Sequence, residues 1–215
     1  GMPSALALPG KSDSFTLAVT KPFTDGFSGT ASVTLNHATD VDPGTDTIAY
    51  NGYSRVARLN PNSDVSATSN YNTARSVKLS LNWQHKFFGD YMSQVSMFYN
   101  GRTGNPYTWV FGNDVNGDSI SGWDPAYIPS ANDPKVSYGN ATAQQIQQFQ
   151  DFLAGDKYLK DHRGQIASRN GARTSWVTTL DMSFSQEIPG LFKGNKGEVR
   201  LDVYNFLNLL DKNWG

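Results

Sequence analysis

The residues with the clearest chemical potential lie in one short acidic segment, Asp114-Val115-Asn116-Gly117-Asp118. Their oxygen side chains stand at positions one, three and five, the spacing of the first ligands in an EF-hand-like calcium loop. Position six is Ser119 instead of glycine, and position twelve is Pro125 instead of an acid. Asp124, at position eleven, can replace that acid only in a shortened loop. Two interpretations stay open: a calcium site formed by Asp114, Asn116, Asp118 and Asp124, or an Asx-rich turn.

The remaining polar residues indicate no reaction. The three histidines, His37, His85 and His162, are dispersed along the sequence. The chain lacks a G-x-S-x-G elbow, an H-E-x-x-H zinc motif, a P-loop and a dinucleotide fingerprint. We therefore expect that the protein is not an enzyme.

Composition excludes several other classes. The net charge of −1 gives no long-range attraction for nucleic acid, so we expect no nucleic-acid partner. The absence of cysteine excludes disulfides, thiolate metal sites and cysteine nucleophiles. No apolar run of about eighteen residues is present, so no membrane-spanning helix is predicted.

The segment around which the other predicted elements are organised is 75–101. Val77, Leu79 and Leu81 alternate with polar residues, which is the period-two pattern of a strand with one apolar face. Gly89-Asp90 supplies a tight reversal, and the chain returns with Val95 and Met97 on the apolar face. The sequence therefore predicts a long, two-faced β-hairpin.

Two further hairpins repeat this pattern. The first contains Phe15, Leu17 and Val19 before a turn predicted at 21–26, and the third runs from 174 to about 207. Long connections rich in turn residues, 38–74 and 102–173, separate the three hairpins. Within the second connection, Thr142 and Gln145 have the spacing of a capping box, so a helix ending at Gly155 is expected.

The length of the strands favours a membrane. Strands of soluble proteins average about five or six residues, whereas the central alternation continues from 76 to 86. Short turns that alternate with long loops are typical of outer-membrane barrels. Aromatic girdles would be formed by Trp83, Phe87, Phe88 and Tyr91 at one end, and by Tyr99, Tyr107, Trp109 and Phe111 at the other. The lumen-facing residues would be Lys78, Asn82, Gln94, Asp181, Glu187, Arg200 and Asp202.

The expected fold class is thus all-β: about six long strands in antiparallel up-and-down hairpins that form a β-barrel or part of one, with one short helix in a long loop. An alternative is a small closed barrel or sandwich in which the apolar face is buried inside. Gly1 ahead of Met2 is interpreted as a tag remnant, so residues 1–13 are assigned to this remnant and an N-terminal extension. Residues 14–215 are assigned to a single barrel-type domain.

Several segments resemble the late barrel region of TonB-dependent outer-membrane receptors of the Oar-like kind, which carry a carboxypeptidase-regulatory-like domain. They are the segments 84–87, 99–107, 167–176, 180–190 and 199–215, and the likeness covers most of the chain from about residue 14. The resemblance implies a barrel of about 22 strands around a plug, which takes up a scarce substrate with energy relayed by TonB.

This resemblance implies a location and partners for the parent protein. The location is the outer membrane of a Gram-negative bacterium, and the partners are the lipid bilayer and, through a plug region that this chain lacks, the TonB system. We expect a fragment without complete activity of its own, and the substrate stays unidentified. The alternative is a soluble all-β binding module, with calcium-assisted carbohydrate recognition through Trp109, Trp123 and Tyr127.

Overall fold

A computed structural model of the chain describes residues 10–44, 48–60, 62–212 and 214. Strands hold 44% of the chain and helices 13%, which confirms the all-β expectation. The described residues divide into two compact units. We call them the hairpin unit (13–37, 73–104 and the described part of 175–215) and the loop unit (10–12 and the described parts of 38–72 and 105–174).

The predicted N-terminal extension differs at its boundary. Residues 1–9 lie outside the described residues, and strand β1 (Lys11–Thr24) already begins within the remainder of the predicted extension. The assignment of 14–215 to a single domain stays a prediction.

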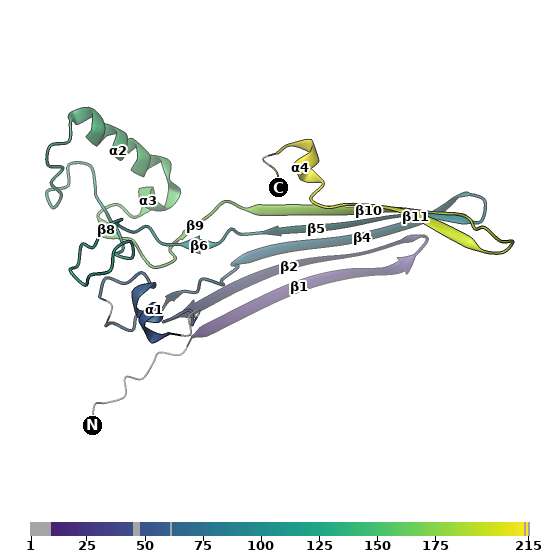
Figure 1. Cartoon of the computed structure of the whole chain (residues 1–215), viewed down its shortest axis with the longest axis horizontal. Coiled ribbons are helices and arrows are strands. Elements are labelled where there is room, and N and C mark those ends of the chain that lie inside the picture. Colours follow the sequence, from purple (N-terminus) through teal and green to yellow (C-terminus); the bar gives the residue numbers. More distant parts are fainter. Residues whose placement is uncertain (1–9, 45–47, 61, 213, 215) are drawn as a thin grey trace, which may run out of the picture. The chain divides into compact units, whose positions relative to one another are not determined.

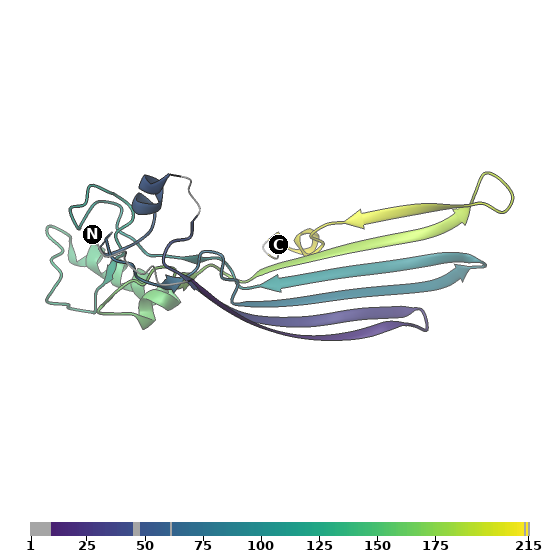
Figure 2. The same cartoon turned by 90° about the horizontal axis from the view of Figure 1, so that it is seen from below.

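The hairpin unit is one sheet of consecutive hairpins (Figure 1). Its strands are neighbours in the order β1, β2 (Phe27–Asp40), β4 (Arg75–Phe88), β5 (Tyr91–Arg102), β10 (Val177–Pro189) and β11 (Lys196–Val203). Figure 2 shows the three hairpins side by side, coloured purple, teal and yellow-green. The short helix α4 (Leu207–Leu210) follows β11. The predicted up-and-down hairpins are confirmed.

The sheet is not closed into a barrel, and β1 and β11 are its two edges. The alternative of a small closed barrel or sandwich is therefore not formed. None of the apolar side chains that would fill its interior, such as Leu79, Leu81 and Met97, belongs to the buried core of the described chain. The physical reason is the pairing pattern: the long strands pair with their neighbours in the order from β1 to β11, and no pairing joins these two edges, as closure of the described sheet would require.

The first turn is tighter than predicted. β1 continues to Thr24 and β2 starts at Phe27, so only Asp25 and Gly26 reverse the chain, with φ of 55° and 77°. Two-residue hairpin turns that match the strand twist need positive φ, and Asp-Gly adopts it readily. Pro22 fits within β1 because β1 is an edge strand, where one face of the backbone has no partner. The turn predicted at 21–26 is thus wrong in its bounds.

The central turn agrees with the sequence pattern, whereas the third, predicted at 189–197, is shorter than expected. Phe88 pairs with Tyr91 across Gly89-Asp90, and Gly89 has a φ of 63°. Pro189 pairs with Lys196, so residues 190–195 form the third connection. One irregularity was not predicted: the register of β4 and β5 shifts between His85 and Phe88.

The register places like residues in rows across the strands. One row joins Gly29, Leu81, Met97, Met182 and Val203, and the next joins Phe27, Trp83, Val95, Phe184 and Leu201. On the other side of the sheet, Asn82 lies in a row with Ser96, Ser183 and Asp202. All seven residues predicted to face the lumen share this polar face. The sheet therefore has one apolar and one polar surface along its whole width.

The loop unit has short elements and a small core of its own. Strand β3 (Ala67–Thr68) pairs with the end of β2, β6 (Pro106–Tyr107) with β9 (Ala172–Arg173), and β7 (Tyr127–Ile128) with β8 (Gln165–Ile166). The helices are α1 (Ala49–Ser54), α2 (Ala143–Gly155) and α3 (Lys157–Asp161). The buried cluster is formed by Ile128, Leu153, Leu159 and Ala167, with Trp109 and Tyr158 packed against it. The connections predicted to be mostly irregular thus enclose a hydrophobic core.

The predicted helix is confirmed as α2. The Thr142 side chain accepts from the Gln145 backbone N–H, and the Gln145 side chain accepts from the Thr142 backbone N–H, which completes the capping box. Leu153 is buried, whereas Phe149 and Phe152 of the same apolar face are exposed. Helix α3 follows at once, because Asp156 caps it through the Leu159 N–H. In the described chain, no helix combines the length and the apolar character needed to cross a bilayer.

Replacing Thr142 by Ala should destabilise α2 by about 1 kcal/mol, because the Gln145 backbone N–H loses the Thr142 hydroxyl that accepts its hydrogen bond. Amide hydrogen exchange of residues 143–147 measures this change. The control is Gln144→Ala, an exposed site in the same first turn, which should leave the exchange rates nearly unchanged. Equal exchange in the wild type and Thr142→Ala would contradict the stabilising role of the cap.

Candidate functional site

The apolar face of the hairpin unit is the largest candidate interaction surface. Large apolar side chains on it are exposed, with Trp83 at 38%, Val33 at 45% and Leu201 at 60%. Such side chains in adjacent rows form a continuous apolar surface, which monomeric soluble proteins rarely expose. This surface can contact lipid or another apolar surface.

An aromatic cluster lies at the turn end of the second hairpin. The Trp83 and His85 rings are parallel with centroids 6.0 Å apart, and Phe87 contacts both rings, at 5.5 Å and 4.6 Å. Phe88 pairs with Tyr91 across the turn. The residues predicted to form the first girdle are therefore brought together.

The second predicted girdle is wrong for Tyr107 and Trp109. Both belong to the loop unit, where Trp109 packs against the buried cluster and meets Phe152 at 5.6 Å. The strand β5 ends at Arg102, before either residue. The physical reason is that the following chain turns into its own small core, which buries an indole more completely than a sheet surface does.

The acidic segment forms a network of turns. Both carboxylate oxygens of Asp114 accept backbone hydrogen bonds, from Gly117 at 2.7 Å and Ser119 at 2.8 Å. These bonds, with that from Gly117 the strongest, hold the pKa of Asp114 below its ordinary value. Asp118 accepts from Ile120 at 2.8 Å, and Asn116 accepts from Asp118 at 2.9 Å. The segment has the bonds expected of an Asx-rich turn.

The structure places the four predicted calcium ligands around this turn. Asp124 is buried, and one of its oxygens accepts from the Val115 N–H at 2.7 Å. Within the described residues, no three acidic or histidine side chains are grouped so that they could hold a metal ion. A calcium ion would need to compete with backbone N–H donors for Asp114, because both of its oxygens are engaged.

The calcium prediction has a direct test. If the loop binds calcium, adding millimolar calcium should raise the melting temperature, and Asp114→Asn should remove the increase because a charged ligand is lost. Asp151→Asn, an exposed acid on α2, is the control that should keep the increase. An unchanged melting temperature in the wild type would show that the segment is only a turn.

Residues 169–173 organise the loop unit. The Arg169 guanidinium forms an ion pair with the Asp40 carboxylate at 2.9 Å and also donates to the Asp40 carbonyl. The Asn170 side chain donates to the Thr68 carbonyl at 2.7 Å. Its φ of 56° lies in the left-handed region, which asparagine adopts more readily than most residues. Arg173 donates to the Asn72 carbonyl at 2.8 Å. These residues therefore tie the chain after α3 to the first long connection.

The role of these residues was not predicted. They lie in a segment without periodicity, and their partners are about a hundred residues away in the sequence, so no local pattern shows the pairing. The sequence contains one signal of this role, which is the closeness of three charged or amide residues in a connection: Arg169, Asn170 and Arg173.

Asp133 is a second organising residue of the loop unit, and it is buried. Its carboxylate accepts from the Tyr127 hydroxyl at 2.7 Å and from the backbone N–H groups of Lys135 and Ser130. The Tyr127 hydroxyl and then these N–H groups hold the pKa of Asp133 below its ordinary value. Tyr127 is thus a structural partner of Asp133, whereas the alternative of a binding module made it a carbohydrate contact.

The loop unit should lose stability in acid through Asp133. Its pKa is lower in the folded state than in the unfolded state, where it is about 3.9, so its contribution is complete above that pH and is lost as the pH falls below it. Melting curves from neutral pH to about pH 3 measure this loss. Asp133→Asn should flatten the acid limb, whereas the exposed Asp151→Asn should not.

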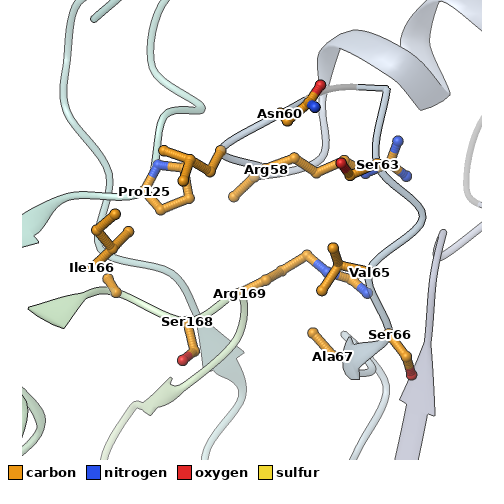
Figure 3. A pocket seen from close by; sticks show the side chains of 13 residues that line it. Arg58, Asn60, Ser63, Val65, Ser66, Ala67, Pro125, Ile166, Ser168 and Arg169 are labelled. Atoms are coloured by element: carbon orange, nitrogen blue, oxygen red, sulfur yellow. The ribbon is translucent and has the colours of Figure 1, made fainter. Parts of the chain in front are cut away.

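A pocket of about 380 Å³ lies in the loop unit between the stems of Arg58 and Arg169 (Figure 3). Pro125 and Ile166 line one side and Val65 the opposite side. We call it the arginine pocket. The Arg58 guanidinium meets the Asp42 carboxylate at 3.4 Å, as Arg169 meets Asp40, so each cation has a carboxylate partner.

The arginine pocket is suited to holding an apolar group. Apart from the two arginines, the described residues that line it carry no charge, and none of them is a histidine or an aromatic residue. The described lining of the arginine pocket therefore has no carboxylate or imidazole that could act as an acid or base, and no aromatic ring on which a sugar could stack.

The other predicted contact residues are dispersed. Trp123 is 39% exposed, whereas Trp109 is packed in the core. His37 lies in β2, His85 in the aromatic cluster of β4 and His162 directly after α3. The structure does not bring the three histidines together.

No protein-family model, curated protein or solved structure matches this chain. A functional conclusion therefore depends on the geometry of the two units and on the sequence resemblance.

Proposed function

We propose that this chain forms a sector of the wall of an outer-membrane β-barrel, with the loop unit as part of its extracellular cap. One observation carries the proposal: four consecutive rows of the sheet, from Phe27 to Val33 on β2, place only uncharged residues on the apolar face. Soluble sheets of this width bury such a face, and here it is exposed.

Strand length supports the same proposal. Strands β1, β2 and β4 have 14 residues each, β10 has 13 and β5 has 12. A membrane-spanning strand needs about 9–11 residues. From Val77 to Phe87, this face follows β4 for about 33 Å, or about 25 Å of height at a tilt of about 40°, which is the thickness of the apolar band of outer-membrane barrels. The polar row of His85, Ser93 and Gln186 crosses the face near the turn end, within the aromatic cluster.

The connections also support it. The up-and-down order puts the short turns at Asp25-Gly26 and Gly89-Asp90 at the same end of the sheet as residues 190–195. Because these turns share one end of the sheet, both long connections start and finish at the strand ends on the other side. Outer-membrane barrels have short periplasmic turns and long extracellular loops. We assign the loop unit to the extracellular side for this reason.

The open edges are consistent with a sector of a larger sheet. Strands β1 and β11 each lack a neighbour on one side within the described sheet. Unpaired edges beside an exposed apolar face promote aggregation in water. In a barrel wall, the strands of the parent protein would pair with both edges.

The assignment to a TonB-dependent receptor depends on the resemblance. Its segment 167–176 contains Arg169, Asn170 and Arg173, the residues that tie the loop unit together. Transport of a scarce substrate would be a property of the complete receptor, and this chain would contribute wall and cap.

The test is the state of the purified chain in water and in detergent, followed by light scattering and far-UV circular dichroism. We expect a β-rich species that aggregates in water and becomes monodisperse in detergent micelles. A monodisperse, β-rich monomer in water, with a Trp83 emission that detergent does not change, would contradict the proposal.

The alternative of a soluble module that binds carbohydrate through Trp109, Trp123 and Tyr127 has less support. Trp109 packs against the core and Tyr127 is hydrogen-bonded to Asp133, so these side chains do not form one surface.

A further inference from the structure

A second pocket of the loop unit, about 310 Å³ in volume, lies between β6, α3 and β9. We call it the α3 pocket. Its aromatic lining is Tyr107, Tyr158 and His162, and its charged lining includes Lys157, Asp161 and Arg173. The volume is at the lower end of the range for small-molecule sites, which is about 300–1,000 Å³.

One wall of the α3 pocket is held firmly in place. The Tyr158 and His162 rings stack with centroids 4.0 Å apart and an angle of 22°. The Tyr158 hydroxyl accepts from the Ser168 N–H at 2.7 Å. A Cβ on Gly171 would lie 2.6 Å from the Tyr158 hydroxyl oxygen, so glycine is required for this close approach. The wall is therefore preorganised by packing and hydrogen bonds.

His162 presents an acceptor on this wall. Its Nδ1 lies 2.8 Å from the Tyr158 carbonyl oxygen. A carbonyl only accepts, so in the neutral ring Nδ1 carries the proton and Nε2 has a lone pair. A hydroxyl of a ligand can donate to this lone pair.

The rest of the lining supplies further donors and acceptors. Tyr107 is fixed by the pairing of β6 with β9, and burial, followed by the charge of Asp156, raises its pKa, so its hydroxyl stays a neutral donor. Within the described chain, no hydrogen bond or ion pair engages the side chains of Tyr107, Lys157 or Asp161. These groups are open to a ligand.

The charges of the α3 pocket balance. Asp156 and Asp161 are offset by Lys157 and Arg173. Two of the four are already engaged, since Asp156 caps α3 and Arg173 donates to the Asn72 carbonyl at 2.8 Å. The site thus favours a ligand without net charge that both donates and accepts hydrogen bonds around its edge.

We propose that the α3 pocket binds a neutral saccharide. A sugar ring has C–H faces that contact aromatic side chains, and hydroxyls that bond to carboxylates, phenols, ammonium groups and imidazoles alike. This inference deepens the proposed function by naming a ligand class for the extracellular cap, and it rests on that function only for its biological meaning. Its physical basis is the loop unit alone.

The test is binding of maltose and N-acetylglucosamine to the full chain in micelles of a detergent without a sugar headgroup, measured by saturation-transfer difference NMR. Galacturonate and the dipeptide Gly-Gly serve as anionic and zwitterionic probes. We expect at least one neutral sugar to bind, and neither charged probe. Tyr107→Ala and Asp161→Asn should each raise the Kd at least tenfold.

Matched controls come from the same helices. Lys157→Ala should weaken binding, whereas Lys160→Ala, on α3 but outside the lining, should not; Asp151→Asn is the control for Asp161→Asn. Circular dichroism checks the fold of each variant. The proposal is overturned if neither sugar binds, if a charged probe binds instead, or if binding survives both Tyr107→Ala and Asp161→Asn. A negative binding result would contradict the saccharide proposal alone, because the proposed membrane function is tested separately by the detergent experiment.

Discussion

Replacing Leu81 by Arg should destabilise the chain in a lipid bilayer by about 2–4 kcal/mol, the cost of a cation on the lipid-facing surface near the midplane. Leu81 lies in a central row of the apolar face, opposite Gly29 on β2 and Met97 on β5. The measurement is a denaturant titration of the chain folded into phosphatidylcholine vesicles, followed by tryptophan fluorescence.

The matched control is the neighbouring substitution Asn82→Arg. Asn82 points to the polar face, in the row of Ser96 and Asp202, so a cation there should cost little. If the two arginines were equally costly, the apolar face would not be the lipid-facing surface.

A second readout keeps this prediction testable if Leu81→Arg does not fold. Trp83 is on the same face and 38% exposed. In a variant whose other tryptophans are replaced by Phe, brominated lipid should quench Trp83. A tryptophan moved to the polar face by Trp83→Phe and Gln84→Trp should be quenched much less, and equal quenching would argue against a lipid-facing surface.

Replacing Arg169 by Met should destabilise the loop unit by about 3–5 kcal/mol, because it leaves the Asp40 carboxylate without its cation in a mostly buried position. The side chains of Arg169 and Asp40 are only 7% and 17% exposed. Thermal unfolding followed by the fluorescence of Trp109, which packs against the loop-unit core, measures the effect.

Two comparisons separate the lost pair from a general effect of losing an arginine. The double variant Arg169→Met with Asp40→Leu should recover part of the stability, because no unpaired charge stays buried. Arg200→Met removes the exposed pair of Arg200 with Asp202 and should change little, since exposed ion pairs contribute little. A double variant no more stable than Arg169→Met would mean that the arginine acts through its other contacts.

The contacts of the loop-unit residues explain why their substitutions are expected to have different effects. Arg169 holds the carboxylate and the carbonyl of Asp40, and Asp133 holds two backbone N–H groups and the Tyr127 hydroxyl, so their loss should affect the folding of the unit. Lys157 and Asp161 line the α3 pocket from an exposed helix, so their loss should affect binding and leave the fold intact. This separation makes the structural and the binding predictions independent.

The sequence by itself determined the hairpin unit. Alternation of period two assigned the residues of the apolar and polar faces of the long strands, and Gly89-Asp90 located the central turn. The capping-box spacing of Thr142 and Gln145 located α2. These features are local, because the strand period and the turn and cap chemistry depend on residues within a few positions of one another.

Only the tertiary structure decided the organisation of the loop unit and the state of the sheet. Arg169 reaches Asp40 across 129 residues of sequence, and the α3 pocket joins Tyr107 to α3 and to β9. Trp109 lies in a core and not in a girdle, and the sheet stays open. The reason is that contacts between distant segments arise from the packing of aperiodic connections, and closure depends on whether the first and last strands pair. A local pattern contains neither kind of information.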